Sequence, residues 1–176
     1  MSVAMLISGL ISGAAMAQDL IAPTYILDSY GVYCGIEGPK QKLAAPGTVL
    51  GYIQVTEADT TATVQTTRVP AALGLSFGVS IRLAEEQSNT AVEFRVTHPT
   101  GRPGERITER WTTQLSGAGP SLNRFAFDYP EELILGLWVL EVVQAGEVVL
   151  RKSFDVVAPE AAADVLSQCS GYTPVS

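Results

Sequence analysis

The sequence has few residues of the kinds that catalysis and metal binding use. Its 176 residues include one histidine and two cysteines, and 16% of the residues are charged. It contains no dense acidic or basic motif, no P-loop, no Rossmann glycine pattern, no EF-hand loop and no heptad repeat. A metal site needs three or four ligands, which one histidine and two distant cysteines do not supply. The sequence therefore predicts no catalytic residue, no metal site and no bound cofactor.

Basic residues are also scarce. There are 11 Lys and Arg against 18 Asp and Glu, which gives a formal net charge of −7. This charge disfavours nucleic acid and anionic membrane surfaces as partners. A composition that is 47% hydrophobic excludes a disordered or collagen-like chain and is typical of one globular domain.

The first seventeen residues carry no charged side chain and end in Ala15-Met16-Ala17. An apolar stretch before Ala-x-Ala predicts a signal peptide over residues 1–17 and a single domain over residues 18–176. The Lys or Arg expected ahead of the apolar stretch is missing, so either the amino terminus supplies the charge or the true start lies upstream. The alternative is a buried N-terminal helix. After cleavage no segment approaches the ~20 apolar residues of a membrane span, and we expect a periplasmic or secreted protein.

Export changes the interpretation of the two cysteines. In an oxidising compartment two thiols near opposite ends of a chain tend to pair. We therefore expect a disulfide between Cys34 and Cys169. The alternative is two free buried thiols.

Alternation of apolar and polar residues dominates the mature chain, which is the pattern of half-buried strands. Leu137 to Val143 and Val148 to Val156 read as a hairpin around Ala145-Gly146, and the segment from Gly35 to Gly47 reads as irregular. Further strands are predicted in the segments Tyr25 to Cys34, Val49 to Val55, Thr60 to Arg68, Phe77 to Leu83, Val92 to Val96, Ile107 to Thr113 and Phe125 to Phe127.

Helix signals are confined to two places. Pro159 precedes a short C-terminal helix over Glu160 to Gln168, and Pro130 to Leu133 forms a single turn. Short strands without crossover helices predict an all-β fold, an immunoglobulin-like antiparallel β-sandwich with a short C-terminal helix.

One pattern matches a catalytic motif. Gly74-Leu75-Ser76-Phe77-Gly78 has the G-x-S-x-G form of serine hydrolases, and Glu93 and His98 follow it in the order acid, base. That motif needs a strand before the serine and a helix after it, whereas Ser76 begins an alternating strand. We therefore interpret these residues as part of a strand. For His98 itself, we expect its ring to hydrogen-bond to the backbone of the following turn.

Other charged and aromatic residues have ordinary interpretations. The pairs Glu85-Glu86 and Glu131-Glu132 lie in turns and are predicted to be solvated. A mixed-charge surface, rather than an anion site, is predicted for Arg102, Arg106 and Arg110, because Glu105 and Glu109 lie between them. Trp111 and Trp138 lie on the apolar sides of their strands and are predicted to belong to the core.

An ordered set of motifs resembles a bacterial family known as domain of unknown function 3859, over roughly residues 24 to 157. The resemblance implies an exported protein with an immunoglobulin-like sandwich, and it implies no catalytic residue. The residues that carry it are Cys34, Val69-Pro70-Ala71, Gly74 to Gly78, His98-Pro99, Phe127-Asp128-Tyr129, Gly136-Leu137-Trp138, Gly146 and Phe154 to Val157.

We therefore expect a non-catalytic module of the cell envelope that binds a protein through its sheet edges or end loops. Two alternatives remain open. One is a small serine hydrolase that uses Ser76 and His98. The other is a structural envelope component without a specific ligand.

Overall fold

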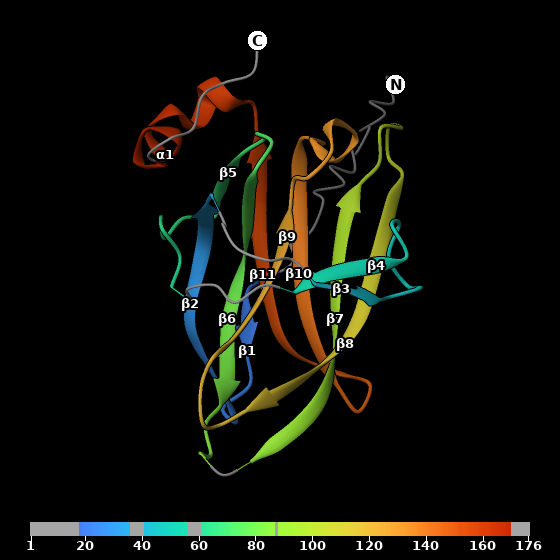
Figure 1. The fold of residues 1–176 in the computed structure, drawn as a ribbon, viewed down its shortest axis with the longest axis vertical. Helices are drawn as coiled ribbons and strands as arrows, with labels where there is room; N and C mark the ends of the chain where they lie inside the picture. The colour runs from blue at the N-terminus through green and yellow to red at the C-terminus, as the bar shows by residue number, and fades with distance from the viewer. Residues whose placement is uncertain (1–17, 36–40, 56–60, 87, 170–176) are drawn as a thin grey trace, which may run out of the picture.

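Two antiparallel β-sheets pack face to face in the computed structural model, and a short helical segment follows the last strand (Figure 1). The structure describes residues 18–35, 41–55, 61–86 and 88–169, so the predicted signal peptide lies outside the described residues. None of the described helices has the length and apolar character needed to cross a membrane. The elements are β1 (Leu20–Ile21), β2 (Tyr25–Cys34), β3 (Gln41–Ala44), β4 (Tyr52–Val55), β5 (Arg68–Pro70), β6 (Leu75–Leu83), β7 (Asn89–Pro99), β8 (Arg106–Ser116), β9 (Ser121–Ala126), η1 (Pro130–Glu132), β10 (Gly136–Gln144), β11 (Glu147–Val157), η2 (Pro159–Ala162) and α1 (Ala163–Gln168).

The strand order is that of an immunoglobulin-like sandwich. The larger sheet runs β1-β11-β10-β7-β8, with β5 pairing in parallel with β11, and the smaller sheet runs β2-β6-β9. Strands β6 and β9 correspond to strands B and E of the immunoglobulin fold. In the larger sheet, strands C, C′, F and G correspond to β7, β8, β10 and β11. The predicted fold class is therefore confirmed.

Most predicted strands are present because their apolar phase faces the core. Strand β2 has the predicted bounds, and Phe77, Val79 and Ile81 of β6 are fully buried. The turn at Pro130 is η1, and the C-terminal helix is divided into η2 and α1, with Pro159 in the first helical turn.

Two predictions of secondary structure were wrong. The segment from Gly35 to Gly47, predicted to be irregular, contains β3, whose four residues are all exposed. Among the described strands, β3 pairs only with β4, and its exposed residues give no alternation of buried and exposed positions that the sequence could reveal. Of the strand predicted over Thr60 to Arg68, the described residues form an isolated bridge between Val64 and Val32, and β5 begins only at Arg68.

The core is built around an aromatic cluster to which both sheets contribute. The ring of Phe77 lies 5.5 Å from that of Phe127, 5.6 Å from that of Trp138 and 5.1 Å from that of Phe154. All four side chains are fully buried. Burying side chains of this size stabilises the fold by roughly 1.5–3 kcal/mol each.

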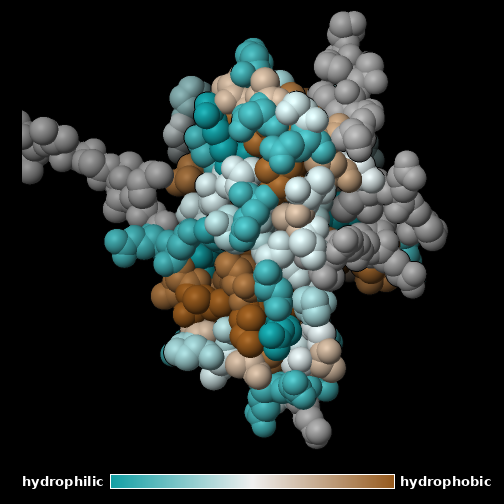
Figure 2. Space-filling model, turned by 90° about the vertical axis from the view of Figure 1, so that its left-hand side faces the viewer, coloured by the Kyte–Doolittle hydropathy of each residue, from teal (hydrophilic) through white to brown (hydrophobic). Residues whose placement is uncertain are grey.

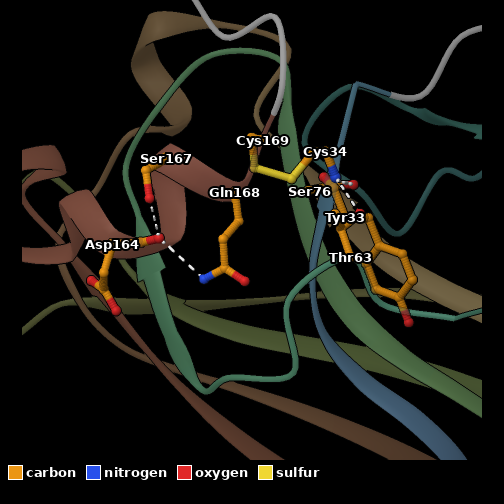
Figure 3. The surroundings of a disulfide bond; sticks show 8 residues. All are labelled: Tyr33, Cys34, Thr63, Ser76, Asp164, Ser167, Gln168 and Cys169. Carbon is orange, nitrogen blue, oxygen red and sulfur yellow. Dashed lines mark hydrogen bonds between the residues drawn. A yellow bond between two sulfur atoms is a disulfide. The ribbon is translucent and has the colours of Figure 1, made fainter.

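A disulfide anchors the C-terminal segment to the sandwich. Cys34 at the end of β2 is bonded to Cys169 just after α1, with Cα atoms 5.3 Å apart (Figure 3). The predicted disulfide is therefore present. The helical segment also buries Ala162 and Val165 in the core cluster.

The outer surface is largely polar on the face seen in Figure 2. Apolar side chains gather there in a patch in the lower half of the view. Among the described residues, the exposed apolar side chains include Leu20 and Ile21 of the edge strand β1, which are 45% and 44% exposed.

Removing the disulfide should destabilise the protein strongly. The bond joins residues 135 positions apart, so it restricts the unfolded chain over a long loop. For a Cys34→Ser/Cys169→Ser variant we expect the free energy of unfolding to fall by about 4 to 5 kcal/mol, measured by urea denaturation. A reducing agent should lower the stability of the wild-type protein and leave that of the variant unchanged. Equal midpoints for the two proteins would contradict this role.

Candidate functional site

A cavity of about 900 Å³ opens where the edge strands β8 and β9 of the two sheets stand apart. The β3–β4 hairpin and the loop before β4 cover part of it, and Figure 1 shows the hairpin lying across β7 and β8. Residues of the segment around η1 also line it. Three separate parts of the chain therefore meet around one hollow.

His98 and Glu109 form a buried pair in the wall of this cavity. The two side chains come from neighbouring strands and lie diagonally across the ladder, because His98 pairs with Ile107 and Glu109 follows Ile107 by two residues. Their residues are 5% and 8% exposed, and His98 Nε2 lies 3.2 Å from Glu109 Oε1. The His98 ring also stacks on that of Trp138, with centroids 4.1 Å apart and planes 9° apart.

Both ends of the pair are fixed by the backbone. His98 Nδ1 lies 2.7 Å from the carbonyl oxygen of Pro99, which only accepts hydrogen bonds, so Nδ1 carries a proton. This contact confirms the predicted bond to the turn. At the other end, the Val49 N–H donates to Glu109 Oε2 over 2.7 Å. Through this bond the carboxylate holds the loop before β4 against β8.

The prediction of a mixed-charge surface was wrong for Glu109, because its side chain points inward. The sequence indicated this position, because Glu109 alternates with Ile107 and Trp111 and so lies on the same face of the strand as these apolar residues. The arginines follow the prediction more closely. Arg106 donates to the carbonyl oxygens of Thr97 and Leu137, and so ties β8 to its neighbour β7 and to β10, the next strand of the sheet.

Polar contacts join the hairpin to the η1 segment beside the cavity. The hydroxyls of Tyr52 and Tyr129 lie 3.3 Å apart, and Gln54 Nε2 donates to Asp128 Oδ2 over 2.7 Å. The hydrogen bond with Tyr129 and the nearby Lys42 lower the pKa of Tyr52. Polar contacts, rather than a packed apolar interface, therefore hold these two walls together.

Acidic side chains gather on the η1 side. Glu132 Oε2 accepts hydrogen bonds from the backbone N–H groups of Asp128, over 2.7 Å, and of Tyr129, over 2.9 Å. Burial raises the pKa of Glu132, and the charges of Asp128 and Glu109 raise it further against the effect of those two bonds. Glu131 is exposed as predicted, whereas Glu132 is half-buried and caps its own turn.

Ser76 lies elsewhere in the sandwich. It sits within β6, between β2 and β9, and no helix follows it, so the elbow geometry of a serine hydrolase is absent. The residue is 1% exposed. Its hydroxyl donates to the Tyr33 carbonyl over 3.4 Å and accepts a hydrogen bond from Arg124 over 2.8 Å. Burial lowers the pKa of Arg124. The hydrogen bonds given above for His98 go to Pro99 and Glu109, so the two residues of the hydrolase alternative do not form a catalytic pair.

The two tryptophans differ. Trp138 is fully buried as predicted, and its Nε1–H donates to the Ile134 carbonyl. Trp111 was predicted to be core, but it is only partly buried. One face stacks on Phe94, with centroids 5.8 Å apart, and the side chain also lines the cavity. Within the described ranges, no three His, Cys, Asp or Glu side chains gather as metal ligands.

Comparisons with known proteins give a family but no activity. A family model described as a domain of unknown function (DUF3859) matches residues 22–156. Among solved structures, the chain is similar to an immunoglobulin-like protein from Pseudomonas aeruginosa, with 26% sequence identity and a TM-score of 0.45 over 72% of this chain and 97% of that one. No curated protein matches the chain.

The role of Glu109 can be tested by comparing a substitution that removes its two hydrogen bonds with one that keeps them. In Glu109→Ala the Val49 N–H and His98 Nε2 both lose their partner, and we expect a loss of about 3 kcal/mol in the free energy of unfolding. In Glu109→Gln the amide oxygen accepts from Val49 and the amide nitrogen donates to a neutral imidazole, so the loss should stay below about 1 kcal/mol. Urea denaturation measures both values, and amide exchange at Val49 should accelerate in the alanine variant alone. Equal losses in the two variants would refute the arrangement, and Glu86→Ala at an exposed turn is the control.

Glu132 should make stability depend on pH. Because its pKa in the folded chain lies above the ordinary value of 4.5, the folded state binds this proton more tightly than the unfolded state. This stabilisation is fully present below the unfolded pKa and is lost as the pH rises through the folded one. Glu132→Gln keeps an oxygen for the two backbone donors but does not titrate.

We therefore expect the stability of Glu132→Gln relative to the wild type to increase as the pH is raised from about 4 to about 7. Urea denaturation at a series of pH values measures this difference. Glu131→Gln, at the exposed neighbouring position, is the control for the loss of one charge. A difference that stays constant or falls with pH would show that the assigned direction is incorrect.

Proposed function

Because the chain belongs to the family described as a domain of unknown function (DUF3859), which names no activity, we propose a function from the site itself. The protein is a non-catalytic binding module of the cell envelope, and it holds a segment of another protein in the cavity between β8 and β9.

The composition of the cavity supports binding. Its volume lies in the range of ligand sites, and its walls combine apolar side chains such as Ile107, Trp111 and Phe125 with a few fixed polar groups. The buried polar groups at its base are hydrogen-bonded within the protein, as the His98–Glu109 pair illustrates. Such groups orient a ligand rather than transfer its protons.

The two flanking strands support a polypeptide as the ligand. Within the part of the chain that the structure describes, β8 pairs with β7 alone and β9 with β6 alone. Strand β9 therefore presents one edge of backbone N–H and C=O groups beside the cavity, whereas the outer edge of β8 is already contacted at Arg110, whose N–H donates to the Gly47 carbonyl over 3.0 Å. An extended peptide that enters there adds main-chain hydrogen bonds to side-chain contacts, which is the usual mode of recognition by strand addition.

Two observations support an envelope location. The Cys34–Cys169 disulfide is a feature of oxidising compartments, and residues 1–17 have the pattern of a signal peptide. The protein is therefore proposed to act in the periplasm or outside the cell.

Filling the cavity should abolish binding. Thr113 lines the cavity, whereas its neighbour Thr112 is exposed on the opposite face of β8. Peptides selected on the purified protein from a displayed random library should bind Thr113→Trp at least about tenfold more weakly, and Thr112→Trp should bind them as the wild type does. Isothermal titration calorimetry measures the affinities, and thermal unfolding shows that both variants fold.

Two results would overturn the proposal. Equal affinity of Thr113→Trp and the wild type would place the binding site elsewhere. Failure to select any peptide would favour the structural component without a specific ligand.

A further inference from the structure

The cavity between β8 and β9 carries an excess of negative charge. Four carboxylates line it, those of Glu109, Asp128, Glu131 and Glu132, against a single guanidinium, that of Arg124, and the imidazole of His98. On the hairpin side its lining includes the apolar Val49 and Leu50, which are 70% and 41% exposed, beside the polar Thr48, Tyr52 and Gln54. Acidic and apolar side chains therefore both line the cavity.

The basic groups of the site are already engaged. Arg124 donates to Ser76 and lies near the charge of Asp128, and His98 faces Glu109. On the η1 side, burial raises the pKa of Glu132, and repulsion from the like charges of Asp128 and Glu109 raises it further. A cation placed beside Glu131 and Glu132 relieves this repulsion.

Aromatic rings on the same cavity offer a second contact for a cation. Trp111, Phe125, Tyr52 and Tyr129 all line it, and the faces of such rings attract ammonium and guanidinium groups. The protein itself shows this contact in the β3–β4 hairpin, where Lys42 Nζ lies 4.1 Å from the centre of the Tyr52 ring.

We infer that the bound segment is basic and apolar: an extended peptide with a Lys or Arg next to aliphatic side chains. This inference rests on the proposed function and names the chemistry of its ligand. The cationic head lies against Glu131, Glu132 and Asp128, and the aliphatic side chains lie against the hairpin wall and Trp111. The net charge of −7 attracts such a partner from a distance.

Three matched peptides test the charge directly. Each is a capped five-residue peptide in which leucine alternates with Lys, Gln or Glu, and calorimetry measures its binding to the full protein at low and physiological salt. We expect the Lys peptide to bind at least about tenfold more tightly than the Gln peptide and the Glu peptide to bind least. In Glu131→Gln/Glu132→Gln the advantage of Lys over Gln should fall to about twofold or less.

The control removes the same amount of charge elsewhere. Glu85→Gln/Glu86→Gln neutralises two exposed carboxylates in the turn after β6, neither of which lines the cavity, and it should leave the advantage of the Lys peptide unchanged. An equal loss in the two double variants would mean that the overall charge attracts the peptide, which overturns the inference.

The remaining outcomes separate this inference from the proposed function. Equal binding of the Lys and Gln peptides overturns the preference for a basic segment but leaves peptide binding in the cavity intact. Absence of binding by the Lys peptide also overturns the inference. In that case the selected peptides and the Thr113→Trp variant still decide whether the cavity binds peptides at all.

Discussion

The unequal width of the two sheets determines where this sandwich is open. The larger sheet extends through β10 and β7 to β8, whereas the smaller sheet ends at β9. Strand β8 therefore has an inward phase, from Ile107 to Thr113, that no described strand of the smaller sheet covers completely. A sandwich of equal sheets buries such a face, but here the β3–β4 hairpin and the η1 segment cover it only in part. The cavity follows from this difference, and so does the edge of β9 that no described strand covers.

The cover is held by directed polar contacts rather than by apolar packing. Glu109 reaches from β8 to the Val49 N–H, the Arg110 N–H donates to the Gly47 carbonyl, and Tyr52 and Gln54 contact the η1 side. Placing a carboxylate in a buried position costs solvation, and the bonds to His98 and Val49 offset that cost. The position of this cover therefore depends on a few hydrogen bonds, and its residues Val49, Leu50 and Tyr52 line the cavity.

The sequence predicted the sandwich well because the side of a strand that carries the apolar residues is the side that packs into the core. The alternating residues of β6 and the hairpin of β10 and β11 bury their apolar sides, so periodicity alone located them. Strand β3 escaped prediction because all its residues are exposed and its pairing partner is β4, a contact that periodicity does not encode. Glu109 was misjudged for a related reason: its charge suggested a surface position, while its phase with Ile107 indicated the interior. Its partner His98 lies on another strand, and only the register of β7 and β8 brings the two together.

The disulfide and the cavity occupy different parts of the fold, and this separation bears on how the protein works. Cys169 fastens α1 beside β2 and β5, on the side of the sandwich away from the β3–β4 hairpin (Figure 1). The covalent bond and the aromatic cluster around Phe77 therefore stabilise the body of the domain without restricting the edges of β8 and β9. Loops and edges on a rigid scaffold are where binding sites usually form. A hydrolase would instead need its nucleophile and base to converge, and here Ser76 and His98 lie in opposite sheets, each held by hydrogen bonds to its own neighbours.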